Sequence, residues 1–375
     1  MIEIRHKQLL SQFALVAALS LSVSATQAGE TIKIGGMAPL SSPGSYQQGP
    51  ELVLGLEWAV ADFNAAGGVL GKQVELVIED DQTTNPGIVL AFSKLAAQSD
   101  IVAFLGSIRS TQVQAMAPYV AENLGKKITM IFPDFAFGHD HRDYFTAAIE
   151  AQGGEVLEHI AIPPTETSFT KYFPKIPRDT EVVYHVMVGP AVLTFVKELG
   201  EFFGPSRPEI FGFIDSLEAT DLTNPGLEFL DGTYFWEGMP RYAQEGGPEF
   251  DAFYREKVGC DASGASVSDP KDISTYAHMF GCWETLYVIK QAMEAAGYAG
   301  PDDRAKLVEA TEALTAFAAG PEHPQGDKVF NGKNHQAYGH QNISVVEGGM
   351  LKVVHTTSIE DGMYEPEADY TTQAL

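Results

Sequence analysis

The sequence contains little cysteine and little positive charge. Its two cysteines, Cys260 and Cys282, stand in no fixed relation to a histidine, which gives a cysteine nucleophile little support. Lys and Arg number 24 against 50 Asp and Glu, and the formal net charge is −26. A surface this acidic repels nucleic acid and anionic membranes, so neither is expected as a partner. The charge does not make a ligand cationic, because the acidic residues are spread along the chain.

Common catalytic and phosphate-binding motifs are also missing. Gly67–Lys72 lacks the glycine spacing and the following Ser or Thr of a phosphate loop. No Ser-His-Asp grouping stands at a recognisable nucleophile turn. His139–Asp143 holds closely spaced metal-ligand types, which leaves a metal-dependent hydrolase as an alternative, but alternate residues that open a helix point apart. An exposed helix N-terminus, where Asp is favoured by the dipole, also accounts for this segment. We therefore expect neither an enzyme nor a cofactor.

The N-terminal segment has the features of a secretory signal. Arg5 and Lys7 precede an apolar run, Leu9–Ala25, which is short for a membrane-spanning helix and passes directly into a polar turn. Small residues at its end predict cleavage after Ala28, so residues 1–28 are read as a signal peptide. No cysteine near the cut is available to carry a lipid. These features predict export as a free protein to the periplasm.

After this segment, strand and helix patterns alternate. The helical stretch carries apolar residues at spacings of three and four, and it ends at Gly67 and Gly68, as glycine often ends a helix. The predicted order is β-α-β-α-β, which is typical of a mostly parallel sheet wound with helices on both faces. The five elements are Ile32–Leu40, Glu51–Ala66, Gln73–Ile78, Pro86–Gln98 and Ile101–Leu105.

Polar residues follow the first and third of these strands. In open α/β sheets, ligands lie outside the carboxyl ends of the strands. Tyr46 follows the first strand, and Ser110 and Thr111 follow the third. The free N–H groups of the next helix, together with these hydroxyls, would seat a carboxylate. The alternative is that Ser110 and Thr111 only cap that helix.

A second β-α-β series begins at Ile128 and is followed by further helices and a closing hairpin. Its expected strands are Ile128–Phe132, Val156–Ile162, Glu181–Met187 and Glu209–Phe213. Helices are expected at Pro248–Val258, Ser274–Ala296 and Asp302–Ala313. The closing strands, Gln341–Val346 and Met350–Thr357, are joined by Glu347-Gly348-Gly349, a good hairpin turn. An oxidising compartment would permit a disulfide between Cys260 and Cys282, and two free thiols are the alternative.

Several stretches together carry a family resemblance. PLSSPGSYQQG, AVADFNAAGGVLGKQVELVIEDDQTTNP and LGSIRST are similar to the leucine/isoleucine/valine-binding proteins, the type I periplasmic solute-binding proteins of ABC importers. KKITMIFPDFAFG and GGEVLEHIAIP extend the resemblance over nearly all of the chain after residue 28. It implies an α/β fold of two doubly wound, Rossmann-like lobes joined by a multi-stranded hinge. The expected division is 29–122 and 241–322 for the first lobe, and 123–240 and 323–375 for the second.

The resemblance also implies a function and partners. A monomeric periplasmic protein would capture a small amino acid between its lobes, with a branched-chain type favoured, and deliver it to an inner-membrane permease and ATPase complex. Amides, urea and aromatic acids are alternative ligands within the same fold, and a sensor role is an alternative to transport. By resemblance, Phe137 holds the place of an aromatic that closes over the ligand, and Asp215 falls near an acidic residue that pairs with the ligand ammonium. A core aromatic and a turn residue are the respective alternatives.

The sequence departs from the family pattern after Val120. The family has a further strand of the first lobe, a hinge crossing and the opening helix of the second lobe before residues that resemble AENLGKKITMIF, and none of these is present here. We expect the first lobe to lack one strand, which exposes a sheet edge or requires a neighbour to cover it. The helix Thr111–Leu124 would serve both lobes. The missing segment normally contributes to the ligand shell, so a variant that has lost binding is a further alternative.

Overall fold

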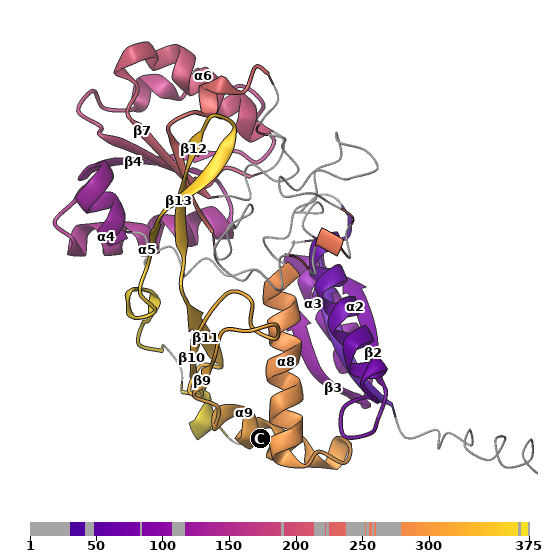
Figure 1. The fold of residues 1–375 in the computed structure, drawn as a ribbon. Coiled ribbons are helices and arrows are strands. Elements are labelled where there is room, and N and C mark those ends of the chain that lie inside the picture. Colours follow the sequence, from indigo (N-terminus) through magenta and orange to yellow (C-terminus); the bar gives the residue numbers. More distant parts are fainter. Residues whose placement is uncertain are drawn as a thin grey trace, which may run out of the picture.

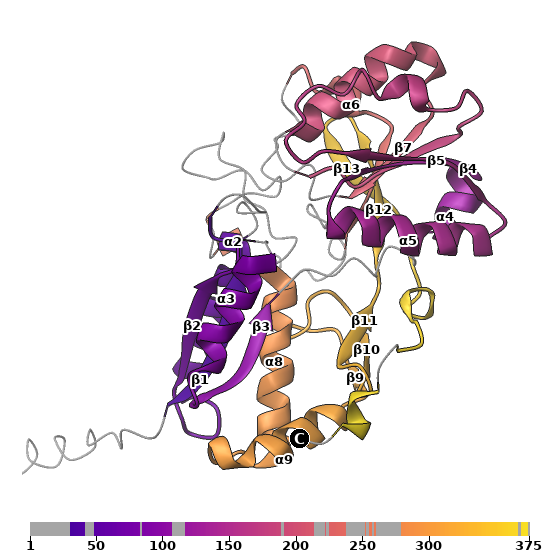
Figure 2. The same cartoon turned by 180° about the vertical axis from the view of Figure 1, so that it is seen from behind.

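The computed structural model describes most of the chain after residue 30. The described ranges are 31–41, 49–82, 85–106, 117–188, 191–213, 225–237, 279–366 and 369–373, with the isolated positions 222, 252, 255–256 and 259. They form two lobes that are linked by extended strands (Figures 1 and 2). Lobe I is the unit around a three-stranded sheet, and lobe II is the unit around a seven-stranded sheet.

Lobe I is built on a parallel sheet of order β2-β1-β3. Gly35 and Gly36 on β1 show how the helices cover it, because neighbouring strand residues face opposite sides. A Cβ on Gly35 would meet Leu95 of α3, and one on Gly36 would meet Leu56 of α2, so the two helices lie on opposite faces. The strands are β1 (Ile32–Ala38), β2 (Val74–Asp80) and β3 (Ile101–Gly106), and the helices are α2 (Gly49–Ala65) and α3 (Asn85–Ala96). The predicted β-α-β-α-β order is confirmed.

Two later helices complete lobe I. The helix α8 (Met279–Ala296) packs along α2 in a shared core with β1, and α9 (Arg304–Glu312) follows it. A small antiparallel sheet of β9 (Ala316–Phe317), β10 (Lys328–Asn331) and β11 (Gln336–Gly339) lies beside α8, where Phe330 and Phe317 pack against Val288. The expected division assigns residues 323–375 to the second lobe. In the structure β10 pairs with β9, so this sheet lies with lobe I.

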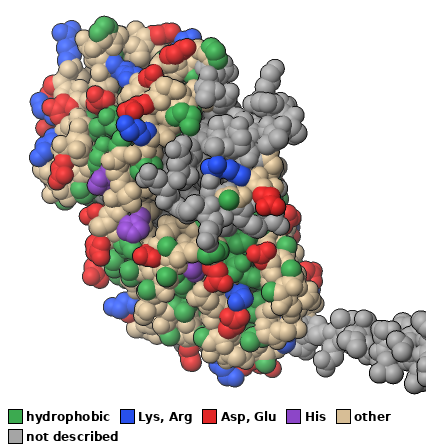
Figure 3. Space-filling view, viewed as in Figure 1, with side chains coloured by type: hydrophobic (Ala, Val, Ile, Leu, Met, Phe, Trp, Pro, Cys, Tyr) green, Lys and Arg blue, Asp and Glu red, His purple; other side chains and the backbone are tan. Residues whose placement is uncertain are grey.

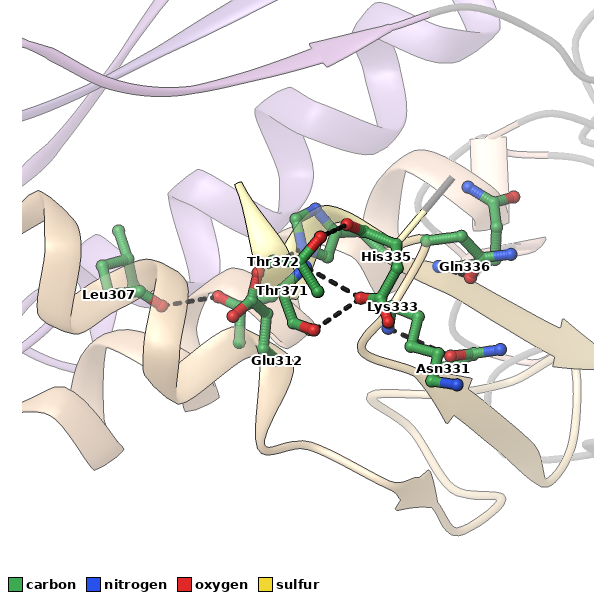
Figure 4. A network of polar contacts seen from close by, with 11 residues as sticks. Leu307, Glu312, Asn331, Lys333, His335, Gln336, Thr371 and Thr372 are labelled. Atoms are coloured by element: carbon green, nitrogen blue, oxygen red, sulfur yellow. Dashed lines mark hydrogen bonds and ion pairs between the residues drawn. The ribbon is translucent and has the colours of Figure 1, made fainter. Parts of the chain in front are cut away.

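The C-terminal residues also return to lobe I. The Tyr370 amide donates a 2.7 Å hydrogen bond to the Lys333 carbonyl, and the His335 imidazole lies 3.0 Å from a Glu312 carboxylate oxygen. Figure 4 shows these groups gathered around the turn at Thr371 and Thr372. The chain therefore crosses from lobe I to lobe II after β11 and returns after the closing hairpin.

Lobe II is built on a mixed sheet of order β13-β12-β8-β7-β6-β4-β5. The strands β4 to β8 are mutually parallel, and the closing hairpin β12–β13 adds two antiparallel strands at one edge. The core on both faces is aliphatic and aromatic. The strands are β4 (Lys127–Pro133), β5 (Glu155–Ile162), β6 (Val182–His185), β7 (Glu209–Phe213), β8 (Thr233–Glu237), β12 (Asn342–Glu347) and β13 (Met350–Thr356), and the helices are α5 (Ala136–Ala151) and α6 (Ala191–Phe203).

The shortened connection is visible at the start of lobe II. The chain runs from α4 (Ala117–Tyr119) through one π-helical turn, Val120–Leu124, directly into β4. Within the described residues the lobe I sheet has three strands, and β3 pairs only with β1. Residues 111–116 of the predicted helix Thr111–Leu124 lie outside the description.

The described surface is acidic over both lobes. Figure 3 shows Asp and Glu side chains scattered over the visible face, with fewer Lys and Arg side chains among them. On this face the described charged side chains of the two signs are interspersed. In the part of the chain that the structure describes, no helix has the length and apolar character needed to cross a membrane.

Candidate functional site

The carboxyl ends of both parallel sheets face the region between the lobes. In lobe II, β12 begins at Asn342 directly after the crossing from lobe I, and Asn342 pairs with Glu237 at the carboxyl end of β8. In lobe I, Gly49 lies against the Pro39 carbonyl after β1, and Gly55 lies against the start of α8. Figure 1 shows that this end of α8 points toward lobe II. Ligands bind at this end of the strands in α/β sheets, so the site is sought here.

Two antiparallel backbone segments connect the lobes beside this region. The Thr357 amide donates to the Gln341 carbonyl at 2.9 Å, and the Gln341 amide donates to the Thr357 hydroxyl at 3.0 Å. Both residues are buried, and the His340 imidazole lies 2.7 Å from the Thr357 carbonyl. These paired segments form the described part of the hinge.

On the lobe I side, Asp80 holds the turn after β1. Its carboxylate accepts hydrogen bonds from the Ser41 hydroxyl at 2.5 Å, the Leu40 amide at 2.9 Å and the Gln82 amide at 3.0 Å. The Ser41 hydroxyl is the main reason that the pKa of Asp80 is lowered. This carboxylate is satisfied inside the protein and needs no ligand ammonium. Sequence reasoning did not select it, although Glu79-Asp80-Asp81 stands at the end of a predicted strand.

On the lobe II side, five rings form what we call the aromatic box. Its members are Phe137 and His141 on α5, Tyr184 on β6, Phe213 at the end of β7 and Trp236 on β8. Phe213 and Trp236 stack with centroids 4.4 Å apart, and Phe137 lies 4.5 Å from His141. Four of the rings are buried and Phe137 is partly exposed. The box is therefore an apolar surface whose one accessible ring is Phe137.

The imidazole of His141 is the polar centre of this box. It is 1% exposed, and its Nδ1 lies 2.9 Å from the Tyr184 hydroxyl. Burial lowers the pKa of His141 to about 3, so the ring is neutral near pH 7. Burial also raises the pKa of Tyr184, which stays protonated. Within the described residues, Nε2 of His141 has no hydrogen-bond partner.

Of the predicted ligand residues, only Phe137 lies within the description. Tyr46, Ser110, Thr111 and Asp215 fall outside it, so their roles stay predictions. Phe137 packs at the margin of the lobe II core and is also partly exposed at the carboxyl end of the strands, which is compatible with both of its predicted roles. His141, Tyr184, Phe213 and Trp236 were not selected, because a buried ring on a strand looks the same in sequence whether it lines a site or fills a core.

The predicted disulfide stays untested. Cys282 is a half-buried residue of α8, and Cys260 lies outside the described residues.

The histidine segment does not assemble a metal centre. His139 is a half-buried residue 2.9 Å from Asp134, with its side chain 41% exposed, whereas His141 is buried in the aromatic box. His139 and His141 are two positions apart on the same helix, and their imidazoles therefore lie in different surroundings. No group of three or more His, Cys, Asp or Glu within the described ranges could hold a metal ion. The geometry gives the hydrolase alternative no support.

A separate groove lies between α5 and the edge strand β5 of lobe II. It has a volume of about 600 Å³ and is floored by Phe132. Its polar groups pair with one another: His139 with Asp134, Arg142 with Asp143, and Thr146 with His159 at 3.0 Å. β5 forms the opposite edge of the sheet from the β12–β13 hairpin that continues into the hinge, so this groove is distinct from the aromatic box.

Comparison with known proteins identifies the family. A family model described as "Periplasmic binding protein" matches residues 31–124 and 106–349. These matches cover most of the chain, which therefore belongs to the periplasmic binding protein family. Residues 106–124 fall in both matches, as expected if this segment serves twice at the shortened connection. Membership implies a periplasmic location.

Particular relatives agree with this assignment. The Leu/Ile/Val-binding protein homolog 6 of Brucella abortus is 22% identical over 353 residues, which covers 80% of this chain and 84% of the relative. An ABC transporter solute-binding protein of R. palustris, solved with 4-hydroxybenzoate, superposes with a TM-score of 0.70 at 18% identity over 92% of this chain and 99% of its own. The branched-chain amino acid transporter substrate-binding protein LivJ of Streptococcus pneumoniae, solved with isoleucine, gives 0.66 at 18% identity over 88% and 99%. The type I two-lobed fold is thus confirmed.

Proposed function

We propose that the chain is the solute-binding component of an ABC importer. It would capture a small amino acid, with a branched-chain type favoured, between its lobes and deliver it to an inner-membrane permease and ATPase complex. The observation that carries the proposal is the position of the aromatic box, where apolar rings meet the carboxyl ends of the lobe II strands and leave Phe137 accessible. The Brucella relative's name and the isoleucine in the LivJ structure support this class of ligand.

The mechanism of capture would be hinge closure. A solute that touches both lobes stabilises the closed arrangement by the difference between its affinities for the closed and open states. The permease would then distinguish the closed protein from the open one. The paired segments at Gln341 and Thr357 supply two strands about which such a rotation could occur. The mechanism needs no covalent step and no cofactor.

An aromatic acid is the second candidate ligand. The box consists of rings, which pack well against another ring in offset or edge-to-face geometry. The R. palustris neighbour was solved with 4-hydroxybenzoate, which supports this class within the same fold. A carboxylate is common to both candidates. The predicted seat for it is the lobe I segment with Ser110 and Thr111.

A thermal shift measurement tests the proposal. Ligand that binds only the folded state raises the stability by RT ln(1 + [L]/Kd), which is about 2.7 kcal/mol at one hundred times Kd. Residues 29–375 should melt at a higher temperature with one class among amino acids, amides, urea and aromatic acids. Phe137→Ala should weaken that response by about tenfold in affinity, because the accessible ring of the box is removed.

Phe202→Ala is the matched control. Phe202 is an exposed ring of the same lobe on α6, in contact with Phe173 and Phe203 rather than the box, so its removal should leave the ligand response intact. A melt that no compound moves, or an equal response in the wild type and Phe137→Ala, would count against the proposed site.

A further inference from the structure

Two nitrogen atoms in the aromatic box lack hydrogen-bond partners. Nε2 of His141 and Nε1 of Trp236 are both buried, and neither has a partner among the described residues. A buried donor or acceptor without a partner loses its hydration without compensation, and such groups are rare in folded proteins. These two nitrogen atoms belong to one cluster, in which the His141 and Trp236 ring centroids lie 6.0 Å apart.

The chemistry of the Trp236, Tyr184 and His141 rings indicates which group donates and which group accepts a hydrogen bond. An indole N–H can only donate, so Nε1 of Trp236 offers no acceptor to the Tyr184 hydroxyl. The Tyr184 hydroxyl is then best used as a donor to Nδ1 of His141, 2.9 Å away. A neutral imidazole that accepts at Nδ1 carries its proton on Nε2. The network therefore assigns His141 as an Nε2–H donor without an acceptor.

The Phe137 ring lies beside this donor. The rings of Phe137 and His141 are 4.5 Å apart with an interplanar angle of 57°, and both residues lie near the start of α5. Phe137 is the one partly exposed ring among the five of the box, and it packs directly on the His141 ring. A rotation of this one side chain would bring Nε2–H to the surface of the site. The buried rings beneath it, Tyr184 and Trp236, would keep the imidazole in place.

We propose that His141 is a specificity residue that donates a hydrogen bond from Nε2 to an oxygen atom on the end of the solute that enters lobe II. The proposal rests on the proposed function and, among its small solutes, moves the preference from purely aliphatic side chains to those that carry an oxygen atom. The solute would combine an apolar or aromatic body, which packs on Phe137 and Phe213, with a hydroxyl or carbonyl oxygen at its far end. A purely aliphatic side chain would leave Nε2–H unpaired, which costs affinity.

Two pairs of probes that differ by one hydroxyl test the proposal. They are threonine against valine, and 4-hydroxybenzoate against benzoate, each titrated calorimetrically into the purified full-length mature chain. A site built to hydrogen-bond a hydroxyl discriminates strongly against the analogue without it. We expect the wild type to prefer the hydroxylated member of the pair that binds by at least about tenfold, and His141→Leu to reduce that ratio to about one. His141→Gln, which restores an N–H donor, should recover part of the preference.

His139→Leu is the matched control. His139 lies two residues away on the same helix, but it is paired with Asp134 and is not a member of the aromatic box, so its replacement should keep the ratio. An unchanged ratio in His141→Leu, or a wild-type ratio of one, overturns the inference while leaving the proposed function in place. A wild type that binds none of the four probes and none of the wider panel contradicts the proposed function and this inference with it.

A spectroscopic measurement tests the assignment without any ligand. Nitrogen-15 NMR distinguishes the two tautomers of a neutral imidazole, and the wild type should show His141 protonated on Nε2. Tyr184→Phe removes the hydroxyl that donates to Nδ1, and it should shift the population toward the Nδ1–H form. A wild-type ring protonated on Nδ1 would leave Nε2 as an acceptor and overturn the proposal.

Discussion

Individual histidines of lobe II show how far burial can alter a titratable group. His185 at the end of β6 is completely buried, and neither ring nitrogen has a partner among the described residues. It packs against Phe195 and Phe235, and a Cβ on Gly212 would lie 2.4 Å from its Nε2. Burial lowers its pKa to about 3, as it does for His141. Both rings therefore fold in the neutral form.

These two histidines should make the protein sensitive to mild acid. Their pKa values fall from the ordinary histidine value of 6.5 in the unfolded chain to about 3 in the folded protein, so below pH 6.5 the unfolded chain binds more protons than the folded chain. The free energy of unfolding is therefore not reduced by these two rings above pH 6.5. It decreases as the pH falls from 6.5 toward 3, by up to about 1.4 kcal/mol per pH unit for each ring. His185→Phe keeps a ring of similar size and should flatten this slope between pH 6 and 4. Urea unfolding at a series of pH values measures it.

The control for this prediction is Phe202→Ala, which removes an exposed ring of the same lobe and no titratable group. It should leave the slope of unfolding free energy against pH as it is in the wild type. A slope in His185→Phe equal to the wild-type slope would contradict the assignment of a neutral buried ring.

At the scale of elements, a buried ion pair ties α8 to the small sheet of lobe I. Lys328 on β10 lies 2.7 Å from the Glu284 carboxylate, and both side chains are more than nine-tenths buried. The carboxylate also accepts from the Gln325 amide at 2.7 Å. Burial raises the pKa of Glu284 even though Lys328 opposes the rise. The ion pair and this hydrogen bond therefore fix the segment between β9 and β10 to α8.

Breaking this pair from one side should cost much stability. Lys328→Met leaves a buried carboxylate without its cation, and we expect a loss of about 3–5 kcal/mol of unfolding free energy. The double variant Glu284→Gln with Lys328→Met should recover part of that loss, because no charge is left buried. Chemical denaturation measures both values.

An exposed pair supplies the comparison. Lys306 lies 2.6 Å from Asp303 at the start of α9, with its side chain 66% exposed, and exposed pairs contribute about 0–1 kcal/mol. Lys306→Met should therefore change the stability much less than Lys328→Met does. Equal losses of unfolding free energy in Lys328→Met and Lys306→Met would contradict the expectation that the buried pair contributes more to stability than the exposed pair.

The elements that local sequence could predict were the long ones with clear periodicity. β1, α2 and β3 were expected from apolar runs, helical spacing and glycine ends, and they occur close to the expected ranges. β9 has two residues and β10 has four, which is too short for a period to show in sequence. Their position beside α8 depends on Phe330 and Val288, residues that are far apart in the chain. Such pairing cannot be inferred from local patterns.

The candidate site was less predictable than the fold for a similar reason. Phe137 could be selected because it stands in a motif, whereas the sequence around His141 indicates an exposed polar segment. Its burial depends on Tyr184 and Trp236, which reach it from β6 and β8. A neutral histidine in an aromatic environment leaves no local mark in the sequence.

At the scale of the whole molecule, two lobes that each contain a set of parallel strands are joined by paired hinge segments (Figure 2). This arrangement is what a solute trap needs, because one ligand can contact both lobes only in the region between them. In this chain the connection from α4 to β4 is short. The lobe I sheet has three strands among the described residues. The binding function thus depends on whether the lobes still meet around a ligand.

The most direct test is a crystal structure of the mature protein saturated with the compound that gives the largest thermal shift. We expect electron density for that compound between the lobes, in contact with Phe137 and with residues at the carboxyl ends of the lobe I strands. Density confined to the groove between α5 and β5, or an empty region between the lobes at saturating compound, would contradict the account.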